Sequence, residues 1–334
     1  MTPRTTVAPV TVLGFDALAV ENDAVRAVII PQLGGRVWEL HDRIRHRQWI
    51  WHRPDLPLRA CAAGEPYDDV WAGGWEELFP NDAAGPFEGR DLPDHGEWWT
   101  LRWRVEHVSE GAEARLRLVS RSTSVRAALV KEYSLAADAP VLTVRYAITS
   151  HEAAPFHFLF KQHLPVAVTP DCELVLPGGM VEAVDPLFGT QLRDRVPFAW
   201  PVGHAGSGAI DLRVIPPAAS RAREFVYVRD LPEGWCAVLD RAADASLRMD
   251  YEQRSFPFVW FFLSYGGWRD VYTAVLEPCT NMPKDLAEAV RRSQSARLLP
   301  GAAFETTLRV SLSGAGGLTV AGGCPGRSRR VPSG

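Results

Sequence analysis

Lysine is scarce in this sequence. The 334 residues contain only Lys131, Lys161 and Lys284 among 36 basic residues, against 40 acidic residues and a formal net charge of -4. Such a balance gives no strong field for nucleic acid or an anionic membrane, so we expect a small-molecule partner. The excess of arginine is compatible with phosphate or sulfonate recognition, but a compositional bias that also raises alanine explains it better.

Cysteine pairs and long apolar runs are lacking as well. The five cysteines are an odd number without a Cys-x-x-Cys pair, and they read as reduced thiols of a cytoplasmic protein. The N-terminus has no leader-like apolar run, and no later stretch is long and apolar enough for a bilayer, so no membrane association is expected. Residues 314–334 are rich in Gly, Ser, Pro and Arg, which predicts a disordered tail.

Several familiar site motifs are absent. The sequence holds no Gly-x-x-x-x-Gly-Lys-Ser/Thr loop, no Gly-x-Ser-x-Gly elbow and no His-Glu-x-x-His. His151, His157 and His163 have the same strand parity, but Pro155 interrupts that stretch and no carboxylate lies at ligand spacing. We therefore expect neither a bound metal nor a cofactor.

Alternation with a period of two dominates the chain. Leu116 and Leu118 alternate with Arg115 and Arg117, and similar runs recur at residues 25–30, 101–107, 141–149, 225–228, 246–251, 272–277 and 306–312. Frequent Gly and Pro separate the runs. The one convincing helix spans residues 283–292, with Asn281 near its cap and Pro283 in its first turn.

This pattern predicts an all-β fold, a many-stranded antiparallel β-supersandwich with one short surface helix, and argues against βαβ units. There is no internal repeat of fixed period and no linker. We expect residues 1–17 to be an N-terminal segment, residues 18–313 one β-sandwich domain, and residues 314–334 the tail.

The segment FHFLFKQH at residues 156–163 reads as a strand with two different faces. Its three phenylalanines point to the core, whereas His157, Lys161 and His163 point the other way. Two imidazoles and an ammonium are too polar for a dry interior, so this face is expected to line a wet cleft. For His157 and Lys161, simple exposure to solvent is an equal alternative.

Two further segments carry comparable chemistry among aromatic residues. LPDHGEWW at residues 92–99 supplies His95, and LEPCTNMP at residues 276–283 supplies Glu277. A histidine exchanges protons near neutral pH, and a partly desolvated glutamate can be tuned toward the same range. Together with His163, these groups suit proton shuttling on a neutral sugar.

An ordered set of motifs resembles the aldose 1-epimerases, or galactose mutarotases. The set comprises PQLGGRV at residues 31–37, GGWEELFPND at 73–82, DHG at 94–96, His163, LEP at 276–278 and LPG at 299–301. The resemblance implies a β-supersandwich with a shallow sugar cleft and no cofactor. It also implies Glu277 as the base at the anomeric hydroxyl, His163 as the acid at the ring oxygen, and His95 as support for the substrate.

The neighbourhoods of the acid and the base depart from the usual family pattern. Residues 162–165 read QHLP and residues 277–279 read EPC, which indicates a divergent member and leaves the sugar and its charge open. We expect the acid and the base to reach opposite sides of one pyranose, so that His163 and Glu277 face each other across a cleft without touching. Further expected substrate contacts are Arg36, Trp75, Asp94, Trp98, His157 and Lys161, although a structural ion pair explains Arg36 equally well.

Two rival functions stay open at this point. A non-catalytic sugar-binding module would keep the cleft without turnover. The other is a polysaccharide lyase or hydrolase. Hydrolysis ordinarily uses two carboxylates, and Asp94, Glu97 and Glu77 are candidates for the partner of Glu277. The sequence also leaves a homodimer open.

Overall fold

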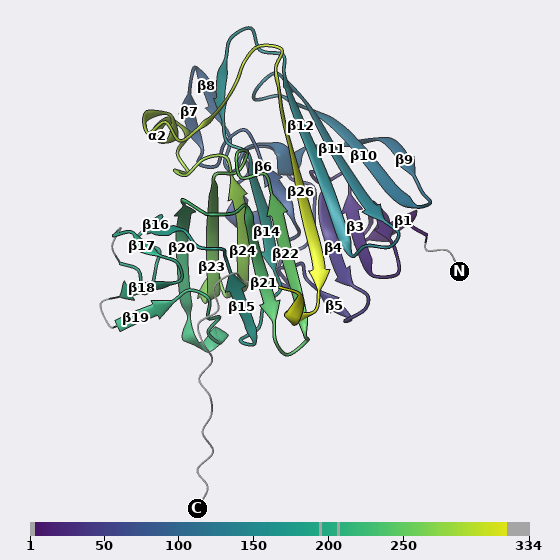
Figure 1. Ribbon diagram of the computed structural model, residues 1–334. Helices are drawn as coiled ribbons and strands as arrows, with labels where there is room; N and C mark the ends of the chain where they lie inside the picture. The colour runs from purple at the N-terminus through teal and green to yellow at the C-terminus, as the bar shows by residue number, and fades with distance from the viewer. Residues whose placement is uncertain (1–3, 194–195, 206–207, 319–334) are drawn as a thin grey trace, which may run out of the picture.

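Antiparallel sheets carry most of the chain (Figure 1), in a computed structural model that describes residues 4–193, 196–205 and 208–318. The first sheet has five strands in sequence order, and each pairs with the next. They are β1 Thr6–Val12, β2 Phe15–Glu21, β3 Val25–Ile30, β4 Arg36–Asp42 and β5 Arg47–Gln48.

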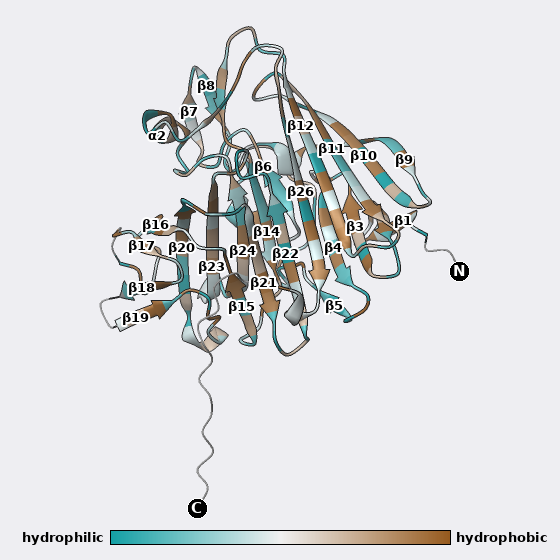
Figure 2. Cartoon of the chain, viewed as in Figure 1, coloured by the Kyte–Doolittle hydropathy of each residue, from teal (hydrophilic) through white to brown (hydrophobic). Residues whose placement is uncertain are grey.

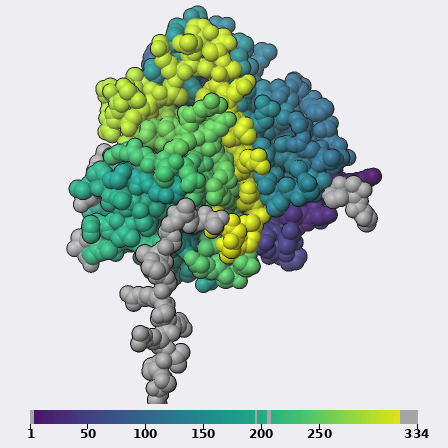
Figure 3. Space-filling model, in the orientation of Figure 1, coloured from purple at the N-terminus to yellow at the C-terminus, as the bar shows by residue number. Residues whose placement is uncertain are grey.

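The second sheet has eight strands in the order β15-β21-β22-β26-β12-β11-β10-β9. Their bounds are β9 Arg104–Ser109, β10 Glu113–Ser122, β11 Ala127–Ala136, β12 Val141–Ser150, β15 Cys172–Val175, β21 Trp235–Asp240, β22 Ala245–Tyr251 and β26 Ala303–Ser313. β26 pairs with both β12 and β22, so the C-terminal strand joins the two halves of the sheet. Figure 3 shows its yellow surface between the blue and the green regions.

The third sheet has seven strands in the order β17-β16-β20-β23-β24-β14-β6. Their bounds are β6 Glu76–Leu78, β14 Lys161–Val166, β16 Met180–Ala183, β17 Phe198–Ala199, β20 Ala222–Arg229, β23 Phe258–Trp268 and β24 Val271–Cys279. Three two-stranded ribbons complete the strands. They pair β7 Gly85–Phe87 with β8 Arg90–Leu92, β13 Phe156–Phe158 with β25 Ala296–Leu298, and β18 Val202–Ala205 with β19 Gly208–Asp211.

The period of two in the sequence has the expected structural cause. Residues of β11 alternate strictly between buried and half-buried positions. In β10, Leu116 and Leu118 are fully buried, whereas Arg115 and Arg117, which alternate with them, are not. Figure 2 shows this alternation as bands along β10, β11 and β12. The inward side chains of the three large sheets join one hydrophobic core, so the predicted all-β architecture is confirmed.

Short helices occur at only a few places in the described chain: α1 Tyr67–Val70, α2 Leu286–Arg291, and the 3-10 turns Trp98–Thr100, Ala218–Ser220 and Ala315–Gly317. None of these helices has the length and apolar character needed to cross a bilayer. α2 confirms the predicted helix but begins later than residue 283. Its N-cap is Asp285, whose side chain accepts from the Glu288 N–H at 2.7 Å, and not Asn281.

The segment at residues 156–163 is two strands and not one. The ladder breaks between β13 and β14, where the N–H of Leu159 donates to Pro80 O at 2.7 Å and that of Phe160 to Thr280 Oγ1 at 2.9 Å. The three phenylalanines are buried as predicted. The other face divides, because His157 stays with β13 while Lys161 and His163 lie on β14.

The described N-terminal residues belong to the first sheet. β1 and the start of β2 lie within the expected N-terminal segment 1–17 and pair along their length in the five-stranded sheet. Strand pairing therefore starts at Thr6, before the domain boundary expected at residue 18. Of the expected tail, residues 319–334 lie outside the described residues.

We predict that Gly73→Ala destabilises the fold more than Gly64→Ala. Both glycines have a left-handed backbone, with φ +90° and +89°. That conformation costs alanine about 1–2 kcal/mol at either position. A Cβ on Gly73 would also overlap the carbonyl of Trp51, whereas a Cβ on Gly64 meets nothing within 4 Å. Overpacking adds about 1–3 kcal/mol, and urea unfolding of both variants measures the difference. Equal losses would contradict a close approach at Gly73.

Candidate active site

A pocket of about 200 Å³ opens over the seven-stranded sheet. β14 contributes Lys161 and His163, and the neighbouring β24 contributes Glu277. Because alternate residues of a strand share a face, these three polar side chains form one patch. The complete lining is Tyr67, Asp68, Trp71, Asp82, His95, Lys161, His163, Asp185, Phe188, Phe225, Phe262, Trp268, Glu277 and Lys284.

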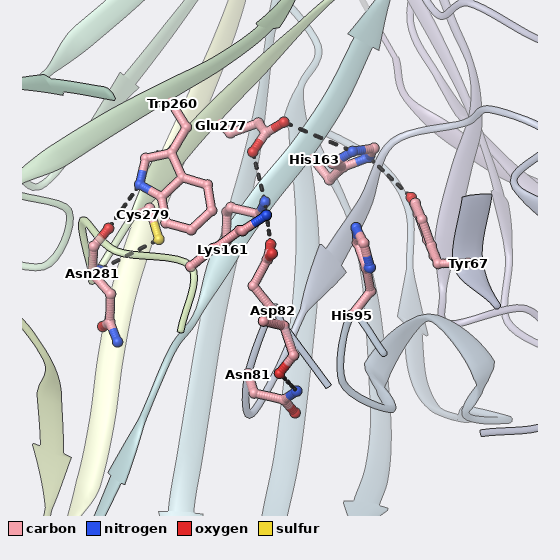
Figure 4. A network of polar contacts seen from close by, with 12 residues as sticks. Tyr67, Asn81, Asp82, His95, Lys161, His163, Trp260, Glu277, Cys279 and Asn281 are labelled. Atoms are coloured by element: carbon pink, nitrogen blue, oxygen red, sulfur yellow. Dashed lines mark hydrogen bonds and ion pairs between the residues drawn. The ribbon is translucent and has the colours of Figure 1, made fainter. Parts of the chain in front are cut away.

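A buried ammonium joins two carboxylates at the base of the pocket (Figure 4). Lys161 Nζ lies 2.6 Å from Asp82 Oδ2 and 2.7 Å from Glu277 Oε2, and it packs over the Trp260 ring at 4.2 Å. Burial raises the pKa of Glu277, and the attraction of Lys161 opposes that rise without cancelling it.

His163 is held from the other side by a tyrosine. Its Nδ1 lies 3.1 Å from Tyr67 Oη, and the Tyr67 hydroxyl donates to Glu76, which is ion-paired with Arg36. Burial lowers the pKa of His163 well below its usual value, and the nearby cations Lys161, His95 and Arg36 lower it further. The resting imidazole is therefore neutral at neutral pH.

His163 and Glu277 are closer than the sequence suggested. His163 Nε2 lies 3.8 Å from Glu277 Oε1, so the two groups stand side by side, and the expectation that they face each other across a cleft without touching is wrong. That expectation placed the reacting oxygens on opposite sides of the sugar. The anomeric oxygen and the ring oxygen of a pyranose are bonded to the same carbon, so an acid and a base that serve them must be neighbours.

His95 lies against the ring of Tyr67, in a turn where its backbone is left-handed. Its backbone has φ +57°, its Nδ1 lies 2.8 Å from Asp94 Oδ1, and its ring stacks on Tyr67 with centroids 4.0 Å apart. Burial lowers the pKa of His95, but the carboxylates of Asp82 and Asp94 together outweigh burial, and the net shift is upward. The two pocket histidines thus differ in charge preference.

Two other predicted substrate contacts lie behind the pocket wall. Arg36 is 5% exposed, donates to Gly73 O at 2.9 Å and is paired with Glu76, which matches the structural alternative stated for it. Asp94 accepts from the Tyr67 N–H at 3.0 Å and holds His95. Both residues support side chains of the lining and do not line the pocket themselves.

Three predicted contacts lie elsewhere. Trp75 and Trp98 are 0% exposed and belong to the main core, so neither offers a surface to a ligand. His157 lies on β13, outside the pocket, with its Nδ1 2.9 Å from Ser295 Oγ. We leave these three residues out of the proposed site.

Several lining residues escaped the sequence reasoning. One wall of the pocket is aromatic and is centred on Phe262. The ring of Phe262 contacts those of Phe188, Phe225 and Trp268, with ring centroids 5.2 to 5.8 Å apart. Trp71 did not escape the sequence reasoning, because this tryptophan lies beside a glycine-rich turn and was a sequence candidate for the cleft on the same grounds as Trp75 and Trp98. It is 3% exposed, and its indole N–H has no partner among the described residues. Asp82 belongs to the motif at residues 73–82, which was the one available signal. Tyr67 belongs to no motif.

The described residues contain no group of three or more His, Cys, Asp or Glu side chains that could hold a metal ion. The carboxylates considered as a hydrolytic partner of Glu277 are also engaged. Glu77 pairs with Lys131 and accepts from Tyr146 Oη at 2.6 Å, and Glu97 accepts from the backbone and side chains of residues 122–124. Neither Glu77 nor Glu97 lines the pocket.

No family model and no curated protein matches this sequence. Solved structures do match. A "putative aldose 1-epimerase" from Klebsiella pneumoniae superposes with a TM-score of 0.69 at 13% identity, over 91% of this chain and 81% of that one. Galactose mutarotase-like proteins from Clostridium acetobutylicum (TM-score 0.67, 14% identity, 93% and 99% covered) and Lactobacillus casei (0.62, 15%, 89% and 100%) are similar over nearly their whole length.

These similarities establish the fold. The chain has the galactose mutarotase-like fold, and the low identities make it a divergent representative, as the motifs predicted. The similarity at this level says nothing of activity, which has to be argued from the pocket.

We predict that Lys161→Met destabilises the protein strongly at pH 7 and much less at pH 4. Removing one partner of a buried ion pair costs about 3–5 kcal/mol, and here two carboxylates lose their cation. Buried without an ammonium, both have folded pKa values above their unfolded values, so the folded state keeps protons that the unfolded state releases. The loss is small near the unfolded pKa values, about 4, and grows as pH rises.

Urea unfolding at the two pH values measures this difference. Lys284→Met is the matched control, because Lys284 also lines the pocket and no ion pair of its side chain is found among the described residues. Its loss should be small at both pH values. An equal loss at pH 4 and pH 7 for Lys161→Met would show that the ammonium does not neutralise these carboxylates.

Proposed function

We propose that the protein is an aldose 1-epimerase-like enzyme that interconverts the anomers of a sugar by acid/base ring opening and reclosure. The observation that carries this proposal is the His163–Glu277 pair, 3.8 Å apart on adjacent strands at the base of the pocket. Both groups can reach the two oxygens of one hemiacetal carbon. No cofactor is needed for this chemistry.

The proposed reaction starts from the form in which Glu277 is ionised and His163, after taking up one proton from solvent, is protonated on both ring nitrogens. Glu277 then takes the proton of the anomeric hydroxyl while His163 Nε2 gives its proton to the ring oxygen. The bond between C1 and the ring oxygen breaks as the C1 carbonyl forms. Rotation about the C1–C2 bond presents the other carbonyl face, and both proton transfers then run in reverse. His95 is proposed to position the sugar, because its ring lines the same pocket and Asp94 fixes it.

The remaining lining supports a sugar as the substrate. The aromatic wall can stack on C–H faces of a pyranose. The volume of about 200 Å³ suits a single sugar ring better than an oligosaccharide. This supports an anomerase over a polysaccharide lyase or hydrolase, as does the engagement of Glu77 and Glu97 elsewhere.

A non-catalytic sugar-binding module is the second candidate. The observation that favours it is the strongly lowered pKa of His163, because a neutral imidazole holds no second proton for the ring oxygen.

Two further expectations concern the location of the protein and its oligomeric state. The proposed location in the cytoplasm is supported by the free thiols of Cys61, Cys172, Cys236 and Cys279. A homodimer stays a prediction.

We predict that Glu277→Gln and His163→Asn each lower the rate of anomer exchange by about 10²–10⁴-fold, the typical contribution of one general acid or base. Saturation-transfer NMR on a panel of aldoses measures the rate, and thermal melts check the fold. His95→Asn should lower rate and affinity together, because it is assigned to positioning.

His157→Asn is the matched control, since His157 lies outside the pocket. It should exchange anomers at nearly the wild-type rate. Near-wild-type exchange in a folded Glu277→Gln protein would remove Glu277 from the mechanism. Sugar binding without exchange by the wild type would select the binding module.

We further predict that neutral aldoses are better substrates than their 6-phosphates. Lys161 is already engaged by Asp82 and Glu277, and His95 by Asp94, which leaves Asp68 and Asp185 against Lys284 in the lining. A phosphate adds negative charge to a pocket with an excess of carboxylates, and a penalty of about 1.4 kcal/mol already gives a tenfold lower kcat/KM. Comparing an aldose with its 6-phosphate tests this, and a preference for the phosphate would refute it.

A further inference from the structure

We propose that Tyr67 is a positioning residue that keeps His163 in the tautomer with its permanent proton on Nδ1. Nε2, the nitrogen nearest Glu277, then becomes the only atom of the ring that takes up and releases the mobile proton. The tautomer itself follows from the contacts around Tyr67, and only its catalytic consequence rests on the proposed anomerase function.

The first step is the single proton of the Tyr67 hydroxyl. That proton is donated to Glu76 Oε1, while the other oxygen of Glu76 contacts the Arg36 guanidinium. An ionised carboxylate has no proton to return. The Tyr67 oxygen can therefore only accept at its 3.1 Å contact with His163, and the proton in that contact belongs to Nδ1.

The second step is the immobility of the Tyr67 ring. Its backbone N–H donates to Asp94, its ring stacks on His95 at 7° between planes, and Trp99 meets it edge-on at 5.1 Å. The residue is 2% exposed. These contacts keep the Tyr67 oxygen between Glu76 and His163. The hydroxyl proton could turn to His163 only by leaving Glu76, which would remove a donor from that buried carboxylate.

The third step is the register of β6 and β14. Glu76 is the direct cross-strand partner of His163, and Tyr67 bridges the two side chains. The acceptor that takes the tyrosine proton is thus fixed by the same backbone ladder that fixes the histidine. Such support of a reacting side chain by its neighbours is what sets the tautomer of a histidine.

The consequence concerns the second proton on the ring. The groups around His163 are Tyr67, Trp71, the cations Lys161, His95 and Arg36, and two carboxylates: Glu277 beside Nε2, and Glu76 on the far side of the Tyr67 hydroxyl. A second proton on Nε2 is attracted mainly from the side of Glu277 and is easily given up. When it goes to the ring oxygen, the neutral ring with Nδ1–H remains, and no proton has to be rearranged on His163 before the reverse step.

Side-chain ¹⁵N NMR of histidine-labelled protein tests the tautomer directly. The spectrum of the His163→Asn protein, compared with wild type, assigns the His163 signals. We expect a protonated Nδ1 and a bare Nε2, which resonates far downfield, in the wild type near neutral pH. A protonated Nε2 with a bare Nδ1 would overturn the inference whatever the activity.

Tyr67→Phe removes the acceptor at Nδ1 together with the donor to Glu76. The permanent proton should then distribute over both ring nitrogens, and anomer exchange should fall by about 10–100-fold, as is typical when a supporting hydrogen bond to a functional histidine is lost. Tyr272→Phe is the matched control, because that hydroxyl donates to Pro216 O at 2.9 Å, outside the pocket, and should leave the tautomer and rate unchanged. An unaltered His163 spectrum in Tyr67→Phe would refute the role of Tyr67.

Glu76→Gln provides a second variant in case Tyr67→Phe does not fold. A side-chain amide can donate to the Tyr67 oxygen and free the hydroxyl proton for Nδ1, so the tautomer should shift toward Nε2–H. The outcomes separate the two proposals. The expected tautomer without exchange of any aldose sinks the anomerase function alone, whereas exchange with a protonated Nε2 sinks this inference alone.

Discussion

The contact of one buried ammonium with two carboxylates is the interaction on which the pocket depends. Lys161 links its own strand β14 to Glu277 on β24 and to Asp82, which follows β6. Three neighbouring strands of one sheet are thereby joined through charge as well as through their ladders. The ammonium also allows the proposed base Glu277 to be buried at all, because an isolated carboxylate at this depth would be protonated or would draw in water.

The ion pair between Lys131 and Glu77 is also buried, and it lies on the opposite face of β6 from Glu76. Glu76 and Glu77 are adjacent residues of that strand, so their side chains point to opposite faces. Glu76 turns toward Arg36 and Tyr67, whereas Glu77 meets Lys131, which also donates to Gly35 O at 3.0 Å. Two of the three lysines in the chain, Lys131 and Lys161, are therefore buried and ion-paired. Although lysine is rare in the sequence, the interior of the protein holds buried ammonium groups.

The sequence predicted much of the fold, because a period of two is a local property that each strand displays by itself. It also brought His95, His163, Lys161 and Glu277 forward, and all four line one pocket. Trp75 and Trp98 could not be told from Trp71 in this way, since burial depends on which sheet covers a turn. Tyr67 and the aromatic wall come from segments that only the tertiary fold brings to β14 and β24. His157 was misjudged because the ladder breaks one residue after β13.

Burial in the pocket shifts the pKa values of the proposed acid and the proposed base in opposite directions. A glutamate and a histidine ordinarily differ by about two pKa units, with usual values of about 4.3 and 6.5. Here burial raises the pKa of Glu277 and lowers that of His163, because desolvation disfavours the charged form of each. Anomerisation runs through the same intermediate in both directions, and each group must give back what it takes. Because the charged form of each group is disfavoured, Glu277 readily takes up a proton and His163 readily gives one up. A buried pair on adjacent strands therefore supports the proposed reversible proton transfer better than two exposed groups of ordinary pKa would.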